Sequence, residues 1–308
     1  MKPILVTCYV NPDLDGVSGS FAYAEFLQKT GKNAVAGTFG EPHEEAKYIL
    51  DRFSIQYPQV LLDVQDFDGV ILVDSSDLKG LDGKVPPEKV VEIIDHRKIN
   101  NASDFPNAKI QIELVGAAAT LVAEKFMEND TVISKEAAIL LCGGILSNTL
   151  NFKAGVTTER DRNAFDWLNK TARLPADFWK ELFQAKSDLG ENKLKERILG
   201  DFAWFEMSDK KVGIAQIEMI GAEKLIQERK VDILQMLEEI KVEKQLDFIF
   251  QSTLELEGEK NFFVTENPET KKLLEKVLKI EFDGNIAIRD GLIMRKQIVP
   301  LLKEELES

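Results

Sequence analysis

The sequence predicts a two-domain α/β protein, with an N-terminal doubly wound parallel sheet and a smaller C-terminal mixed α/β domain. In the first half, short apolar runs alternate with amphipathic stretches, which is the pattern of strands joined by helical crossovers. The second half has longer strand-like runs around a charged helix. A polar stretch at 189–195, with Gly190 and Asn192, predicts an exposed connection, so we expect domains at 1–188 and 195–308.

The first domain is predicted to contain four strands and five helices. Apolar runs predict strands at 4–10, 70–74, 90–95 and 110–114. Helices are expected at 18–30, 43–53, 116–128, 134–151 and 158–170. Gly31 is a stop signal for the first helix, and Thr158 with Asp161 forms a capping box for the last. Gly143-Gly144, inside an apolar helix, predicts close packing and not a phosphate loop, because no helix begins directly after it.

The second domain is predicted from fewer, longer elements. Strands at 211–220 and 246–254 flank a charged helix at 222–244, and a further helix covers 268–278. Turn signals at 256–260 and at Asp283-Gly284-Asn285 separate the last short strands. These elements together predict a mixed sheet with helices.

Composition limits the classes of function. The chain has 308 residues, with 53 acidic against 39 basic side chains and a net charge of −14. A nucleic-acid surface or an anionic membrane patch needs clustered Lys and Arg, so neither is expected. Two cysteines in apolar stretches, the lack of a long apolar run and the absence of a signal-peptide pattern predict a cytoplasmic enzyme.

Acidic side chains follow three of the predicted strands. Asp13 and Asp15 come after the first strand, Asp74 ends the second, and Asp95-His96 ends the third. Parallel α/β sheets bind ligands beyond the carboxyl ends of their strands, so these groups are expected to meet at one edge. Clustered carboxylates repel unless cations neutralise them, and a site rich in carboxylates suits Mg²⁺ or Mn²⁺ better than Zn²⁺.

Each of these residues has a plainer alternative. The Asp13-x-Asp15 sequence is also typical of an Asx turn, which holds no metal. Asp74 alone could cap a helix, and Asp95 could serve as the partner that orients His96.

The motifs resemble those of the DHH phosphoesterase superfamily, and within it the family II, manganese-dependent inorganic pyrophosphatases. The segments that carry this resemblance are Asn11-Pro12-Asp13-x-Asp15, Val73-Asp74, Asp95-His96-Arg97 and residues 141–162. In the second half, residues 210–216 and 295–300 resemble the associated C-terminal domain. The likeness covers nearly the whole chain.

The resemblance implies a role for each matched residue. Asp74 would bridge two metal ions, Asp13 would bind one of them, and Asp15 and His96 would bind the other. The oxygen of Asn148 would complete the second site. For the substrate, the resemblance implies phosphate contacts from Arg97, Arg295 and Lys296, and it implies a homodimer formed through the first domain.

Four positions depart from the family pattern. A histidine ligand is replaced by Tyr9, an acid by Asn148, a substrate-binding histidine by Arg97, and a lysine near Asp201 by Ala203. Tyr is a poor ligand when neutral and Asn brings no charge, so we expect one usable metal position and a second that fills weakly. Arg97 brings a permanent planar cation suited to phosphate oxygens.

The expected function is metal-dependent hydrolysis of pyrophosphate or a related phosphoanhydride or phosphoester. Water activated by Mn²⁺ or Mg²⁺ would attack phosphorus in a cleft between the domains, with Asp13, Asp15, Asp74 and His96 as the metal-binding set. Pyrophosphate is the first candidate for the small phosphorylated substrate, and a short polyphosphate or a nucleotide is the close alternative. The alternative is a weakened or inactive homologue that binds a phosphorylated ligand or a metal as a sensor.

Overall fold

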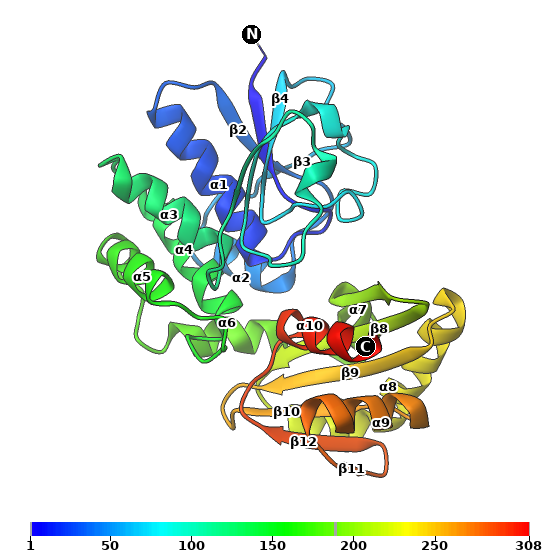
Figure 1. Ribbon diagram of the computed structural model, residues 1–308. Helices are drawn as coiled ribbons and strands as arrows, with labels where there is room; N and C mark the ends of the chain where they lie inside the picture. The colour runs from blue at the N-terminus through cyan, green and yellow to red at the C-terminus, as the bar shows by residue number, and fades with distance from the viewer. Residues whose placement is uncertain (1, 188–189, 308) are drawn as a thin grey trace. The chain divides into compact units, whose positions relative to one another are not determined.

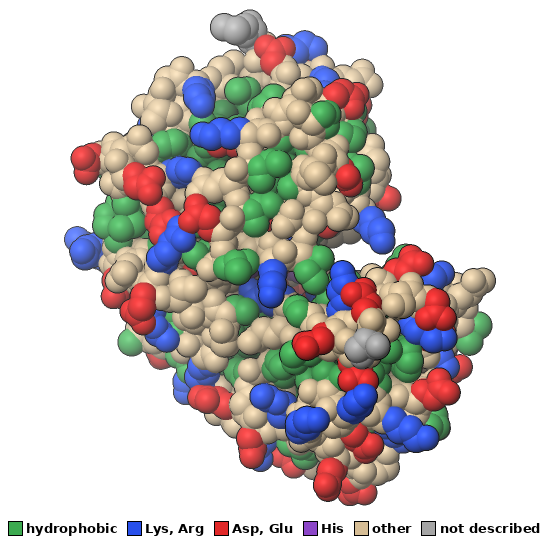
Figure 2. Space-filling view, in the orientation of Figure 1, with side chains coloured by type: hydrophobic (Ala, Val, Ile, Leu, Met, Phe, Trp, Pro, Cys, Tyr) green, Lys and Arg blue, Asp and Glu red, His purple; other side chains and the backbone are tan. Residues whose placement is uncertain are grey.

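The computed structural model describes residues 2–187 and 190–307, and the chain divides into two compact units, Met1–Ala185 and Lys186–Ser308. The α/β class and the second, mixed sheet agree with the prediction (Figure 1). Among the described residues, no helix is both long enough and apolar enough to cross a membrane. On the face in Figure 2, acidic and basic side chains of the described residues are interspersed.

The first unit contains a six-stranded parallel sheet in the order β3-β2-β1-β4-β5-β6. Its strands are β1 (Ile4–Thr7), β2 (Ala34–Thr38), β3 (Gln59–Val60), β4 (Gly69–Val73), β5 (Val90–Asp95) and β6 (Lys109–Ile112). After β1 the chain builds outward on one side, and it then returns to build β4, β5 and β6 on the other. The order therefore reverses between β1 and β4, which makes that position the switch point where such sheets bind ligands.

Helices cover one face of this sheet, and loops with short 3₁₀ turns cover the other (Figure 1). The helices are α1 (Leu14–Lys29), α2 (Glu44–Arg52), α3 (Ala118–Glu128), α4 (Lys135–Asn148), α5 (Glu159–Ala172) and α6 (Phe178–Ser187). The 3₁₀ turns are η1 (Pro87–Lys89) and η2 (Ala102–Asp104). Alternate residues of β4 serve the two faces, because Ile71 and Val73 pack under the helices while Val70 and Leu72 face the loops. Both faces are buried, which explains why the strand reads as a continuous apolar run.

The second unit is a mixed sheet in the order β11-β12-β10-β9-β8-β7, in which only β8 and β9 run parallel. Its elements are α7 (Gly190–Gly200), β7 (Phe202–Met207), β8 (Lys210–Met219), α8 (Ala222–Lys244), β9 (Phe248–Glu255), β10 (Lys260–Val264), α9 (Pro268–Leu278), β11 (Phe282–Asp283), β12 (Ile286–Asp290) and α10 (Arg295–Leu306). Residues of α7 and α8 pack on one face and those of α9 and α10 on the other.

The predicted connection at 189–195 needs correction. Residue 189 lies outside the described residues, and from Gly190 onward the chain is helical, in α7. Leu194 and Ile198, four residues apart, are both buried against the second sheet. Burial of this apolar stripe stabilises a helix that the surrounding polar residues did not suggest.

Candidate metal centre

The segment after β1 positions two of the predicted acids, and it enters a helix sooner than the sequence predicted. The helix begins at Leu14, four residues earlier than predicted, because the Asp13 side chain accepts a hydrogen bond from Gly16 N at 3.0 Å and caps it. Asp15 therefore lies in the first helical turn. A helix start is a favourable place for a carboxylate, since the N-terminal end of the helix dipole is positive.

Asp15 is fully buried, and backbone amides from another helix hold it. Its Oδ2 accepts from Ala118 N and its Oδ1 from Ala119 N, both at 2.8 Å. These amides belong to the first turn of α3, so the start of a second helix also faces the carboxylate. Asn148 Nδ2, at the end of α4, donates to Oδ2 at 2.5 Å. Asp15 is thus fixed in position by three donors.

His96 follows β5 and presents one defined ring nitrogen to the acids. Its Nδ1 lies 3.0 Å from the Val115 carbonyl oxygen, which can only accept, so Nδ1 carries a proton. The Nε2 atom lies 3.3 Å from Asp74 Oδ1 and 3.6 Å from Asp15 Oδ2. A carbonyl that fixes the tautomer of a histidine is the usual partner behind a metal-binding imidazole.

Asp74 joins the cluster from a strained backbone position. It follows β4, has a φ of 57°, and its amide donates to Ile94 O at 2.8 Å. No helix begins at Asp74, so the helix-cap alternative is wrong. Backbone strain of this kind is often found at functional sites.

The three groups fit a divalent cation. The ligand atoms of Asp15, Asp74 and His96 lie within 4.8 Å of one another, and all three residues are buried. One divalent cation can contact all three, because each carboxylate offers an acceptor oxygen and the imidazole, whose Nδ1 carries the proton, offers the lone pair of Nε2. Two oxygen ligands with one imidazole suit Mn²⁺ or Mg²⁺.

Electrostatics support the same conclusion. Burial, with the nearby charge of Asp74, raises the pKa of Asp15 to about 8 and that of Asp13 to about 6 in the metal-free chain. Burial and a neighbouring carboxylate disfavour the charged form of a carboxylic acid, whereas a neighbouring cation favours it. A divalent ion at the cluster would supply that charge.

Arg97 is anchored among acids next to the cluster. Its Nη2 donates to the Asp74 backbone oxygen and lies 3.4 Å from Asp74 Oδ1, and its Nε lies 3.4 Å from Asp95 Oδ1. Burial alone would lower the pKa of the guanidinium, but the charges of Asp95 and Asp74 outweigh it and raise that pKa. Asp95 does not take the alternative role of orienting the imidazole of His96, whose Nδ1 faces the Val115 carbonyl. Asp95 Oδ1 accepts instead from the backbone amide of His96 at 2.7 Å.

Comparisons with known proteins agree with this geometry. The family model "DHH family, N-terminal domain" matches residues 3–145, and the model "DHHA2 domain" matches residues 180–305. A manganese-dependent inorganic pyrophosphatase of Bacillus subtilis is 30% identical over 308 residues, which cover 99% of each chain. The chain belongs to the DHH family.

Solved structures extend the likeness to the whole DHH-family fold. A Methanococcus jannaschii protein assigned to the family II inorganic pyrophosphatases superposes with a TM-score of 0.84 at 27% identity, over 99% of this chain and all of the other. An exopolyphosphatase-related protein from Bacteroides fragilis shares the fold, with a TM-score of 0.52 at 15% identity over 99% and 92% of the two chains.

Two of the predicted metal ligands of this DHH-family chain stand apart from the three-residue cluster. Asp13 caps α1 and is not among the residues whose ligand atoms converge. Asn148 turns its amide nitrogen to Asp15, whereas the prediction required its oxygen to face a metal ion. Asn148 therefore acts on the cluster through Asp15 in this structure.

Asp161 supports the cluster from a distance, a role that its place in a predicted capping box does not indicate. Its side chain does accept from Thr158 N at 2.7 Å, but it also accepts from Gly116 N at 2.9 Å and from Thr120 Oγ1 at 2.6 Å. The segment that it holds contains the Val115 carbonyl beside His96 and the amides beside Asp15. The only signal in the sequence is an acid at the third helical position, which is common at ordinary helix starts.

The predicted phosphate contacts of the second unit lie at the start of α10. Arg295 is paired within its own unit, where its Nη2 lies 2.5 Å from Asp201 Oδ1 and its amide donates to Gln216 Oε1. Lys296 follows it in the first turn of α10, and Ala203 lies on β7. The structure thus puts two cations at a helix N-terminus, where anions are favoured.

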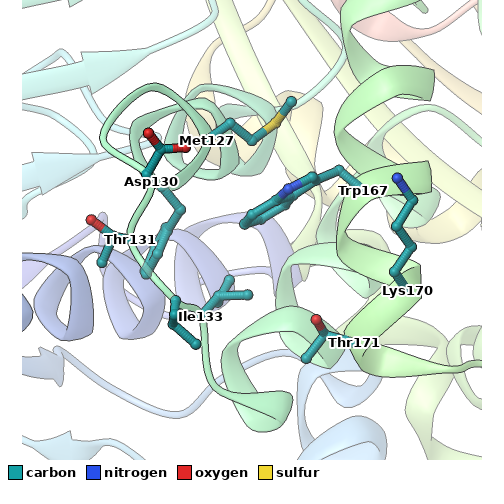
Figure 3. A pocket seen from close by; sticks show the side chains of 9 residues that line it. Met127, Asp130, Thr131, Ile133, Trp167, Lys170 and Thr171 are labelled. Carbon is teal, nitrogen blue, oxygen red and sulfur yellow. The ribbon is translucent and has the colours of Figure 1, made fainter.

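A pocket of about 350 Å³ lies elsewhere in the first unit. It is formed by the end of α3, the segment that follows it and α5, with Trp167, Met127 and Ile133 on its wall (Figure 3). Asp130 is the only acid that lines it, and it contains none of the cluster residues. Its lining is therefore unsuited to a metal ion.

Proposed function

We propose that the protein hydrolyses pyrophosphate with a divalent ion, Mn²⁺ or Mg²⁺, held by Asp15, Asp74 and His96. One observation carries the proposal: the buried ligand atoms of Asp15, Asp74 and His96 lie within 4.8 Å of one another at the switch point of the sheet, where one divalent cation can contact all three. The full-length likeness to a manganese-dependent inorganic pyrophosphatase supports Mn²⁺ as the ion and pyrophosphate as the substrate.

The chain's own residues would divide the work. When bound, a divalent ion acts as a Lewis acid that polarises phosphoryl oxygens and makes water more acidic. Backbone groups hold the side chains of Asp15 and His96 in position before an ion binds. Asp13, which lies close enough to Asp74 to raise its own pKa, would serve as the proton acceptor or as an additional metal contact.

Cations would bind the phosphoryl groups. Arg97 is about one-third exposed, so part of its guanidinium remains accessible while three acids anchor it. Arg295 and Lys296 would bind phosphate at the start of α10, supported by the helix dipole. The chain's net charge of −14 makes such local cations necessary for a polyanionic substrate.

The test is phosphate release by the full chain from pyrophosphate, tripolyphosphate and a dinucleotide, each with Mn²⁺, Mg²⁺ or no metal. We expect release from pyrophosphate with Mn²⁺ and its loss in His96→Gln, which keeps the size of the side chain but weakens the ligand. Glu159→Gln, at an exposed position of α5, is the control. Release from another substrate alone would change the substrate class, and tight binding without release would favour the sensor alternative.

We also propose that the protein is a cytoplasmic homodimer. The strand β6 has a neighbour on one side only among the described residues, and Ile110 and Leu114 at this edge are 47% and 63% exposed. An open edge with apolar side chains favours pairing with a second copy. Two buried free thiols, Cys8 and Cys142, support a reducing compartment.

Light scattering after size-exclusion chromatography tests the dimer. We expect the wild-type chain to elute as a dimer and Ile110→Lys to shift it to a monomer. Val132→Lys, at a residue 80% exposed away from this edge, should leave the dimer intact. A monomeric wild-type chain would contradict the proposal.

A further inference from the structure

The surroundings of Arg97 resemble those of a bound cation. Each nitrogen of the guanidinium faces an acidic residue: Nη2 faces Asp74, Nε faces Asp95 at 3.4 Å, and Nη1 faces Asp77 at 3.9 Å. A single side chain thus compensates three carboxylates next to the metal-binding cluster. The planar fork of arginine is suited to such multiple contacts.

Asp74 connects this arginine to the cluster through one oxygen atom. Its Oδ1 lies 3.4 Å from Arg97 Nη2 and 3.3 Å from His96 Nε2. The same carboxylate oxygen therefore lies between the permanent cation of Arg97 and the imidazole of His96, which is a predicted metal ligand. In two-metal sites, one carboxylate is shared by two metal ions. Here the guanidinium of Arg97 takes the place of one of those ions beside Asp74.

Tyr9 supports the arginine and is not free to act as a ligand. The guanidinium carbon lies 5.7 Å from the centre of the Tyr9 ring, a cation–π contact. The Tyr9 hydroxyl oxygen accepts from Asp13 N at 3.1 Å, so this oxygen already has a partner. Tyr9 and Arg97, two of the four residues that depart from the family pattern, therefore contact each other.

We infer that Arg97, stacked on Tyr9, is a built-in second cation, so that the centre takes one divalent ion per chain and a phosphoryl group binds between that ion and the guanidinium. The phosphoryl part of this inference rests on the proposed function. The predicted number of metal ions does not rest on the proposed function, because it depends only on the carboxylates whose charge Arg97 already compensates. A second ion next to Asp74 would have to displace or approach a permanent positive charge.

The count can be measured on the metal-stripped full chain by equilibrium dialysis against Mn²⁺ with elemental analysis, together with electron paramagnetic resonance of the bound ions. We expect about one Mn²⁺ per chain with a mononuclear signal in the wild-type protein. Arg97→Lys keeps the charge and should behave in the same way. Arg97→Gln leaves Asp74, Asp77 and Asp95 without their cation, so it should gain a second, weaker ion and a spin-coupled signal.

The control and the contradicting results separate this inference from the proposed function. Arg162→Gln removes a cation from α5 that pairs with Glu159 at 3.9 Å, and should leave the count unchanged. Two coupled ions in the wild-type chain would overturn the inference, as would a single ion in a folded Arg97→Gln. The wild-type count decides the question even if Arg97→Gln fails to fold. Failure of the proposed function would appear instead as no phosphate release, whatever the number of ions.

Discussion

Asp15 combines deep burial with a position among donors and other acids, and its protonation controls the charge of the centre. Backbone amides stabilise its ionised form, but burial and the Asp74 charge dominate and raise its pKa to about 8. In the metal-free chain the folded state therefore keeps a proton that the unfolded chain releases near its usual pKa of about 3.9. Stability of the metal-free chain should fall as the pH rises between these two values.

The pH dependence of metal binding should have the opposite sign. A divalent ion displaces the proton of Asp15, so Mn²⁺ affinity should rise between pH 6 and pH 8 and level off above. The expected slope is up to about tenfold per pH unit for each proton released. Calorimetry at several pH values, in buffers of different ionisation enthalpy, measures both affinity and proton release. An affinity independent of pH across this range would contradict the assignment of Asp15 as a ligand.

At the scale of elements, the approach of α4 to α1 depends on Gly144. A Cβ atom there would lie 2.5 Å from Ser18 Oγ, 3.2 Å from Ala119 Cβ and 3.4 Å from Asp15 Cα. The predicted close packing of Gly143-Gly144 is thus confirmed, and it occurs directly behind the metal-binding cluster. Packing this tight leaves no room for a methyl group without a shift of α1 or α3.

Gly144→Ala should therefore weaken both stability and metal binding. We expect a loss of about 1–3 kcal/mol in the free energy of unfolding, as is usual for an overpacked core, and a lower Mn²⁺ affinity because Asp15 moves. Chemical denaturation and calorimetry measure the two effects. Gly200→Ala, also at a helical glycine but with no atom within 4 Å of the added carbon, should change neither. Full affinity in Gly144→Ala would show that α1 tolerates the shift.

The start of α5 acts on the cluster through Asp161. Asp161→Asn keeps the size of the side chain but removes the charge that accepts from Gly116 N, Thr120 Oγ1 and Thr158. We expect Mn²⁺ affinity to fall by about 10-fold or more, the usual effect of losing a supporting partner of metal ligands. Glu159→Gln, two residues away and 86% exposed, should leave it unchanged. Equal affinities for the two variants would mean that the 115–119 segment holds its position without Asp161.

These elements also show where prediction from sequence succeeds. The helices 222–244 and 268–278 were predicted with the bounds that the structure has, because their charged faces are local signals. The strands β2 and β3 were missed, since Ala34–Thr38 is short with three small residues and Gln59–Val60 is exposed. Asp15, Asp74 and His96 were predicted together because strand-end acids of a parallel sheet must meet at one edge.

The parts of the site that the sequence could not show depend on contacts between distant segments. Asp161 meets Gly116 across 45 residues, and Asn148 meets Asp15 across 133. Nothing in the residue types decides whether Asn148 offers its oxygen to a metal ion or its nitrogen to a carboxylate. The helix start at Leu14 likewise depends on the Asp13 cap, which was interpreted as a ligand.

At the scale of the whole molecule, a chain with a net charge of −14 brings two buried acids and one buried imidazole together in its first unit, where a divalent cation would compensate the acids. The central claim is that Asp15, Asp74 and His96 bind that cation, and calorimetric titration of the metal-stripped chain with Mn²⁺ tests it most directly. We predict saturable binding by the wild-type chain, its loss in Asp74→Asn, and unchanged binding in Asp66→Asn, whose side chain is 97% exposed. Binding of equal affinity in Asp74→Asn and the wild-type chain would contradict the claim.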